Sequence, residues 1–217
     1  GIGITGICGS GIIEAVAEMY LVGLVDTGGR VTGEDAEDCP HVVRSGEVYD
    51  YLLHKGPPAL HVTQTDVRSI QLAKAALYAG ARLLMDNFGV ASVERIVLAG
   101  AFGTYMDPLH AMILGMIPDC DLSRVVAAGN AAGAGARIAL LSRGARAEIE
   151  ELVGRVEKIE TAAEKRFHKY FVAAMAFPHR DDTFPNLERA LANPEPSRLS
   201  NSDRVSDNSQ PAPRAAR

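Results

Sequence analysis

The spacing of apolar side chains predicts most of the helices in this chain. The strongest pattern runs over 66–88, where apolar residues recur at three- and four-residue steps. Thr65 or Asp66 is expected to cap its first turn, and Gly89 to end it in the left-handed conformation. The same spacing predicts a helix over about 11–22. Further helices are expected near 108–115, 130–142, 145–154 and 163–175.

Short apolar runs bounded by turn residues predict strands between these helices. They are expected over 47–53, 60–63, 95–99, 125–128 and 156–160. Residues 26–46, rich in Gly, Asp and Glu, are interpreted as a surface excursion, and residues 100–107 as a loop. Strands that alternate with helices predict an α/β fold, with a mixed sheet flanked by helices.

The composition changes near the C-terminal end. From about Asn193 the sequence is rich in Pro, Ser, Asn, Asp and Arg and has almost no apolar residues. Such a segment cannot bury enough surface to offset the entropy of ordering it. We therefore predict a folded unit over 1–192 and a disordered tail over 193–217.

Composition and charge narrow the functional classes. The 217 residues are 47% hydrophobic, which suffices for a sizeable core, and their net charge of −5 argues against a general nucleic-acid binder. No apolar run approaches the ~18 residues of a membrane span. Three distant cysteines without a CxxC motif argue against a disulfide framework and against a self-contained zinc or iron–sulfur site. A cytoplasmic location is the expectation.

Three glycine loops beside predicted helices are the candidate ligand sites. A helix N-terminus preceded by glycine presents free N–H groups and a positive dipole end, and the missing side chains let a ligand approach the backbone. One such loop is more often a tight turn than a ligand site, whereas three in one α/β chain make the two interpretations equally good. The loops are Gly9-Ser10-Gly11, Gly100-Ala101-Phe102-Gly103 and Gly129-Asn130-Ala131-Ala132-Gly133.

Other motifs are weaker. Gly1, Gly3 and Gly6 have the spacing of a dinucleotide fingerprint, but the expected helix begins too far beyond them. Of the scattered histidines, His110 has the best placement for a role, because it follows the second glycine loop. Cys8 lies beside a helix N-terminus, where a thiolate would be stabilised, although a small buried residue is the favoured interpretation.

Four longer phrases carry a family resemblance. They are ITGICGSGIIEAVAEMYLVGLVD (4–26), VTQTDVRSIQLAKAALYAGARLLM (62–85), RIVLAGAFGTYMDPLHAMILGMIPD (95–119) and GNAAGAGARIALLS (129–142). Their order resembles the second lobe of the ATPase fold shared by actin, Hsp70 chaperones and the sugar and acetate kinases. The phrases themselves resemble the C-terminal ATPase domain of reductive activators of corrinoid-dependent enzymes, over about residues 3–178.

This resemblance implies a function. Members of the family are thought to bind ATP with Mg²⁺ and to couple it to reduction of a Co(II) corrinoid to Co(I), serving a corrinoid protein in a methyltransferase system. The electron comes from an N-terminal domain, commonly with a [2Fe–2S] cluster. By resemblance, Gly100, Ala101, Phe102 and Gly103 form the adenosine loop, and Gly9, Ser10 and Gly11 lie near the ribose or adenine.

The resemblance also suggests a role for one face of the long helix and for a second helix later in the chain. Gln71, Lys74 and Tyr78 share the face that would line the base, and the alternative is an exposed polar stripe. Gly129 and Ala132 would belong to a helix whose small side chains let helices cross and hinge.

The resemblance leaves some expectations and alternatives open. The phosphate-binding hairpins and their Mg²⁺-positioning acids are expected upstream of Gly1, so the isolated chain should have little ATPase activity. An incomplete sheet edge would favour self-association, for example as a homodimer. One alternative is a non-catalytic binding or dimerisation module of the same fold. Another is an activator of a 2-hydroxyacyl-CoA dehydratase, which the phrase from Cys8 to Gly11 resembles.

Overall fold

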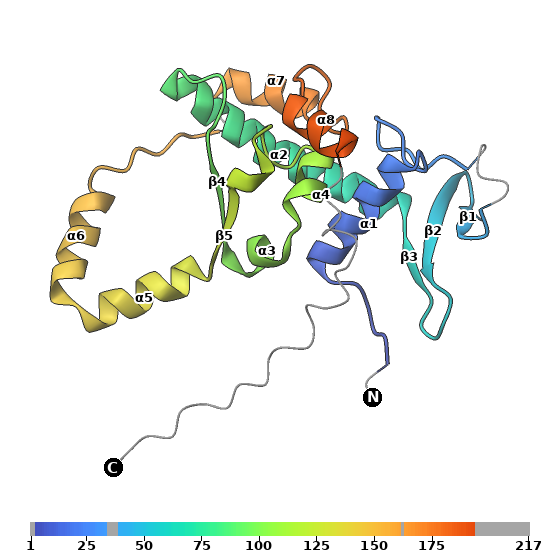
Figure 1. Ribbon diagram of the computed structural model, residues 1–217, viewed down its shortest axis with the longest axis horizontal. Coiled ribbons are helices and arrows are strands. Elements are labelled where there is room, and N and C mark those ends of the chain that lie inside the picture. The colour runs from blue at the N-terminus through green and yellow to red at the C-terminus, as the bar shows by residue number, and fades with distance from the viewer. Residues whose placement is uncertain (1–2, 34–38, 162, 194–217) are drawn as a thin grey trace, which may run out of the picture.

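Helices and strands alternate along the chain in the computed structural model, which describes residues 3–33, 39–161 and 163–193 (Figure 1). The helices are α1 (Gly9–Leu21), α2 (Gln64–Phe88), α3 (Gly100–Tyr105), α4 (Pro108–Ile113), α5 (Ala131–Leu141), α6 (Arg143–Val153), α7 (Lys165–Ala173) and α8 (Pro185–Ala192). The strands are β1 (Val42–Ser45), β2 (Val48–His54), β3 (Leu60–Val62), β4 (Ile96–Ala99) and β5 (Val125–Gly129). The predicted tail lies outside the described residues, except for Asn193.

The strands form two small sheets. The order β1-β2-β3 is antiparallel throughout, whereas β4 and β5 pair in parallel, with Val97 opposite Val126. Figure 1 shows the antiparallel sheet at one end of the molecule and α5 and α6 at the other, with α2 running between them. The expected α/β architecture is confirmed, whereas the single mixed sheet is not, because the described strands form two sheets, one antiparallel and one parallel.

The long helix α2 is fixed at both ends. Its N-cap is Thr63, two or three residues earlier than the sequence suggested. Asp66 completes a capping box: the Thr63 amide donates to Asp66 Oδ2 at 2.9 Å and the Asp66 amide to Thr63 Oγ1 at 3.1 Å. The predicted caps Thr65 and Asp66 were therefore misplaced. Gly89 ends the helix in the left-handed conformation, with φ of 68°, as predicted.

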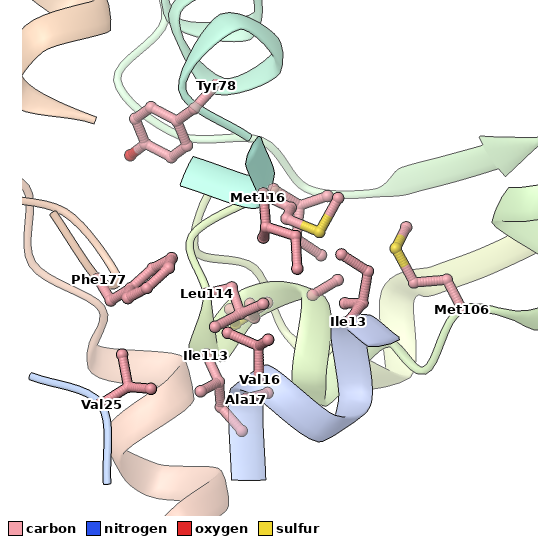
Figure 2. Close-up of a cluster of buried hydrophobic side chains, with 14 of the residues drawn as sticks. Ile13, Val16, Ala17, Val25, Tyr78, Met106, Ile113, Leu114, Met116 and Phe177 are labelled. Atoms are coloured by element: carbon pink, nitrogen blue, oxygen red, sulfur yellow. The ribbon is translucent and has the colours of Figure 1, made fainter. Parts of the chain in front are cut away.

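The core joins segments that lie far apart in the sequence. Figure 2 shows side chains from α1, from α4 and the residues after it, and from the loops around 25, 106 and 177 converging on one cluster. Burying each such side chain stabilises the fold by about 2 kcal/mol, so this cluster fixes α1 against α4. The labelled members are Ile13, Val16, Ala17, Val25, Tyr78, Met106, Ile113, Leu114, Met116 and Phe177.

Several predicted elements were wrong. The supposed surface excursion over 26–46 contains β1 and the buried Val31, which bridges to Val25. The predicted loop over 100–107 contains helix α3, and residues 156–160 form no strand. Helix α8 was not predicted, because its single buried side chain, Leu187, gives no periodic signal.

Candidate functional site

The first two glycine loops lie against each other. Helix α1 begins at Gly9, and the ring of Phe102 in α3 lies directly over that residue. A Cβ atom on Gly9 would be 2.9 Å from Cε2 of Phe102, so any side chain at position 9 would displace the ring. Two segments that the sequence suggested for the same ligand are therefore neighbours.

The N-terminus of α1 is capped by a sulfur atom. The Gly11 amide donates to Sγ of Cys8 at 3.4 Å, and Ser10 Oγ lies 3.4 Å from the same sulfur. These contacts, with Ser10 and then with Gly11, lower the pKa of the Cys8 thiol. Cys8 is exposed, so its interpretation as a small buried residue was wrong. The sulfur is a weak acceptor, which leaves the amides of this turn open to a stronger one.

The turn into α3 needs glycine at two positions. Gly100 has φ of 90°, a conformation that favours glycine. A Cβ on Gly103 would lie 3.0 Å from Cβ of Leu98 and 3.1 Å from its backbone carbon, so glycine lets α3 pack closely on β4. The N-cap residue Ala99 makes no side-chain hydrogen bond, and the first amides of α3 are thus free of a side-chain cap.

A cleft of about 380 Å³ lies beside this turn. It is shaped by the end of α3 and the loop after it, by one residue of α1 and by one residue from each strand of the parallel pair. Polar and apolar side chains both line it, so it offers hydrogen-bonding groups as well as apolar contact. The lining residues are Glu14, Leu98, Gly103, Thr104, Tyr105, Met106, Asp107, Pro108 and Ala127.

His110 is part of an ion-pair cluster that joins α1 to α4. Its Nε2 lies 2.7 Å from Glu18 Oε1, and its Nδ1 lies 3.3 Å from Asp107 Oδ1, at ion-pair distance. Asp107 first, and then Glu18, raise the pKa of His110 to about 9 against the opposing effect of burial. The side chain is therefore an imidazolium at neutral pH, and its evident role is to hold the two helices together.

Gln71, Lys74 and Tyr78 do not form an exposed stripe. All three are buried, and each binds the segment that follows α7. Gln71 Nε2 donates to the Met175 carbonyl at 2.8 Å, Lys74 Nζ to the Pro178 carbonyl at 2.7 Å, and the Tyr78 hydroxyl to Asp182 Oδ2 at 2.7 Å. Lys74 also donates to the Ala176 carbonyl.

Burial governs the ionisation of this face of α2. It lowers the pKa of Lys74 to about 7, although the two carbonyls and the face of the Phe177 ring, 5.2 Å away, favour the ammonium. Burial and the neighbouring Asp182 raise the pKa of Tyr78. With their polar atoms engaged by backbone and carboxylate, these side chains anchor residues 175–182 and are not free to contact a base.

The third glycine loop leads into α5. Gly129 has φ of 64°, and Asn130 caps the helix by accepting a hydrogen bond from the Gly133 amide at 2.9 Å. No residue of α5 is buried, so within the described structure the small side chains Gly129 and Ala132 serve no close helix crossing.

The described residues offer neither a cluster of metal-binding side chains nor a membrane-spanning helix. Within 3–33, 39–161 and 163–193, no group of three or more His, Cys, Asp or Glu side chains is placed to hold a metal ion. None of the helices in these ranges is long and apolar enough to cross a membrane.

Sequence reasoning missed most of the cleft. Glu14, Thr104 and Tyr105 belong to none of the three glycine loops, and their convergence depends on how α3 folds back on β4. Asp107 gave a usable signal, because Asp before Pro is a common start of a helix. Its Oδ1 accepts from the Leu109 amide at 2.8 Å and from the His110 amide at 3.2 Å.

The fold and this site define the class of protein. The structure is an ASKHA-type α/β domain, similar to a solved reductive activator for corrinoid, iron–sulfur protein with a TM-score of 0.73 and 30% identity, over 81% of this chain and 29% of that one. A family model described as the C-terminal domain of RACo, the ASKHA domain, matches residues 2–188. The chain belongs to this family, which confirms the resemblance.

A curated relative supports the same assignment. Corrinoid activation enzyme RamQ of Eubacterium limosum is 36% identical, over 79% of this chain and 31% of RamQ. The chain thus spans less than a third of the length of either relative. These matches favour the corrinoid branch over the activators of 2-hydroxyacyl-CoA dehydratases.

Proposed function

We propose that this chain forms the adenosine side of an ATP site in a reductive activator, which couples ATP to reduction of a Co(II) corrinoid to Co(I). The observation that carries the proposal is the contact between the two glycine turns, where Phe102 lies against Gly9, while Gly103 of the second turn lines the cleft. The family supports it, since both similar proteins are named for corrinoid activation.

The residues present fit a nucleoside. Phe102 is 49% exposed, so its ring offers a face on which a base can stack. Gly100 brings backbone close to a ligand, and the uncapped amides of α3 add donors. Gly9, Ser10 and Gly11 present the positive end of α1 next to the ring. When bound with Mg²⁺, ATP supplies phosphate charge and the energy of its hydrolysis.

In this proposal, the chain binds and orients the nucleoside, while other parts of the activator hold the phosphates, Mg²⁺ and a [2Fe–2S] cluster. Such a cluster would supply the one electron that reduces Co(II) to Co(I). The partner is a corrinoid protein, and a second copy of the chain is a further partner. Gln71, Lys74 and Tyr78 are assigned no part in nucleotide binding.

The binding test uses the purified chain, isothermal titration calorimetry and two ligands, ATP and adenosine. Because the chain supplies the adenosine side, adenosine should bind and should compete with ATP. Phe102→Ala is expected to lower the affinity for both ligands roughly tenfold, because it removes about 1–1.5 kcal/mol of stacking energy. The control is Phe88→Ala, an exposed phenylalanine at the end of α2. Equal affinities for the wild type and Phe102→Ala would contradict the site assignment.

The coupling test needs the full-length activator and its corrinoid protein. Absorbance would follow the conversion of Co(II) to Co(I) with and without ATP. We expect ATP to accelerate the conversion in the wild type, and the Phe102→Ala variant to need more ATP for the same rate. Conversion that ignores ATP would refute the coupling, while leaving the binding result intact.

A further inference from the structure

The cleft beside the second glycine turn is unfavourable for phosphate. Two acidic residues, Glu14 and Asp107, belong to its lining, and the described residues that line it include no lysine or arginine. Asp107 is paired with the His110 imidazolium, whose Nδ1 lies 3.3 Å from its Oδ1. By contrast, within the described residues no hydrogen bond or ion pair engages the Glu14 carboxylate. The uncompensated charge in the cleft is therefore that of Glu14, and it repels an anionic group.

The polar side chains around the cleft mostly accept hydrogen bonds. The Thr104 hydroxyl already donates to the Gly100 carbonyl at 2.8 Å, which leaves its oxygen as an acceptor. The carboxylates of Glu14 and Asp107 are acceptors only. Among the polar side chains of the described lining, the Tyr105 hydroxyl alone keeps its proton for a ligand. The cleft is thus matched to an uncharged group that donates hydrogen bonds.

Glu14 lies near the surface proposed for the base. It is five residues beyond Gly9, which corresponds to about 7.5 Å along the axis of α1. Phe102 packs against Gly9, and the next residue in the chain, Gly103, lines the cleft. Phe102 itself is not part of the lining, so a base stacked on its ring stands beside the cleft. The sugar attached to that base is then the part of the ligand that reaches Glu14.

We propose that Glu14 binds the ribose of the nucleotide by accepting hydrogen bonds from its 2′- and 3′-hydroxyls. The inference rests on the proposed adenosine site and assigns a further group of the same ligand to the cleft. The two hydroxyls are on adjacent carbons, and the carboxylate has two oxygens, so each oxygen accepts one charge-assisted bond. The phosphates point out of the cleft, toward the parts of the activator that would hold them.

The test compares four nucleosides on the purified chain by isothermal titration calorimetry. They are adenosine, 2′-deoxyadenosine, 3′-deoxyadenosine and purine riboside, which keeps both hydroxyls but lacks the 6-amino group of adenine. The wild type should bind each deoxynucleoside roughly tenfold more weakly than adenosine, because each has lost one hydrogen bond to a charged group. Purine riboside serves to distinguish the ribose from the 6-amino group as the partner of Glu14.

Glu14→Ala should lower the affinity for adenosine at least tenfold and abolish its advantage over the two deoxynucleosides. It should weaken purine riboside by the same factor, since that ligand keeps both hydroxyls. Glu14→Gln keeps one acceptor oxygen without the charge and should retain part of the preference. The matched control is Glu151→Ala, which removes an exposed carboxylate from α6 and should preserve all four affinities. Circular dichroism would verify that each variant is folded.

The outcomes separate this inference from the proposed function. A wild type that binds adenosine no more tightly than the deoxynucleosides, or a Glu14→Ala variant that keeps the preference, would overturn the role of Glu14 and leave the adenosine site intact. A Glu14→Ala variant that weakens adenosine but not purine riboside would place the 6-amino group at Glu14 and also overturn the ribose assignment. A wild type that binds no nucleoside would refute the proposed site and the role of Glu14 together.

Discussion

The Nζ atom of Lys74 lies 2.7 Å from the carbonyl oxygen of Pro178, more than a hundred residues away in the sequence. This contact, with the bond from Lys74 to the Ala176 carbonyl, fastens the segment after α7 to the middle of α2. Phe177 between the two carbonyls is buried in the core, and the Tyr20 hydroxyl donates to its carbonyl at 2.9 Å. A fully buried lysine here is a structural anchor.

Lys74→Met should destabilise the fold. The substitution keeps the apolar stem but leaves the carbonyls of Ala176 and Pro178 without their buried donor. Removing a donor in this way costs about 2–3 kcal/mol, which urea unfolding would measure. The control Lys55→Met alters an exposed lysine and should change the free energy of unfolding by less than about 0.5 kcal/mol. Equal effects at the two positions would show that Lys74 is no anchor.

Gly115 adjoins the same segment from the other side. It has φ of 66°, and a Cβ atom there would lie 1.9 Å from the carbonyl oxygen of Pro178. Gly115→Ala should therefore cost about 3 kcal/mol or more, since it adds a backbone clash to the left-handed strain.

Gly23→Ala isolates the strain from the clash. Gly23 has φ of 78° and no atom within 4 Å of its would-be Cβ. The Gly23→Ala substitution should lower the free energy of unfolding by only about 1 kcal/mol, as measured by chemical denaturation. If Gly115→Ala lowers the free energy of unfolding no more than Gly23→Ala does, residues 176–178 do not pack where the structure places them.

Local patterns predicted local structure well. Helical spacing and the Gly89 terminator located α2, and short apolar runs located β2, β3, β4 and β5. They did so because the helix satisfies its own backbone hydrogen bonds, and because helix and strands alike carry their apolar side chains at a regular spacing. The glycine turns at Gly9 and Gly100 were recognised from their composition, although the helix that begins at Gly100 was predicted as a loop.

Contacts between distant segments could not be predicted in this way. Gln71, Lys74 and Tyr78 look like a polar stripe because nothing nearby in the sequence shows what covers them. Their partners at 175–182 lie in a segment with isolated apolar residues and no periodicity, such as Phe177. The cleft beside α3 was missed for a similar reason, since Glu14 reaches it from another helix.

The contact between Gly9 and Phe102 should appear as an energetic coupling. Gly9→Ala places a methyl group against the ring, and removal of the ring by Phe102→Ala should relieve the clash. We expect Gly9→Ala to cost about 1 kcal/mol more in the wild type than in the Phe102→Ala background, as measured by a double-mutant cycle of unfolding free energies. Gly6→Ala, where a Cβ meets no atom within 4 Å, should show no coupling to Phe102.

The pH dependence of stability should contain two opposing contributions. His110 has a pKa of about 9 in the folded state, above its ordinary value of 6.5, so its contribution is complete below pH 6.5 and is lost as the pH rises through 9. Lys74 has a folded pKa of about 7, below its ordinary 10.5. The unfolded chain therefore binds more protons at this site between pH 7 and 10.5, and stability rises with pH.

Between pH 7 and 9 the two contributions partly cancel, so the free energy of unfolding of the wild type should change little with pH. His110→Asn removes the falling contribution, and its free energy of unfolding should rise with pH across this window. Lys74→Met removes the rising one, and its stability should fall over the same range. Urea titrations of the three proteins at several pH values would measure the slopes. Parallel profiles would mean that neither side chain titrates with the shifted pKa that its surroundings impose.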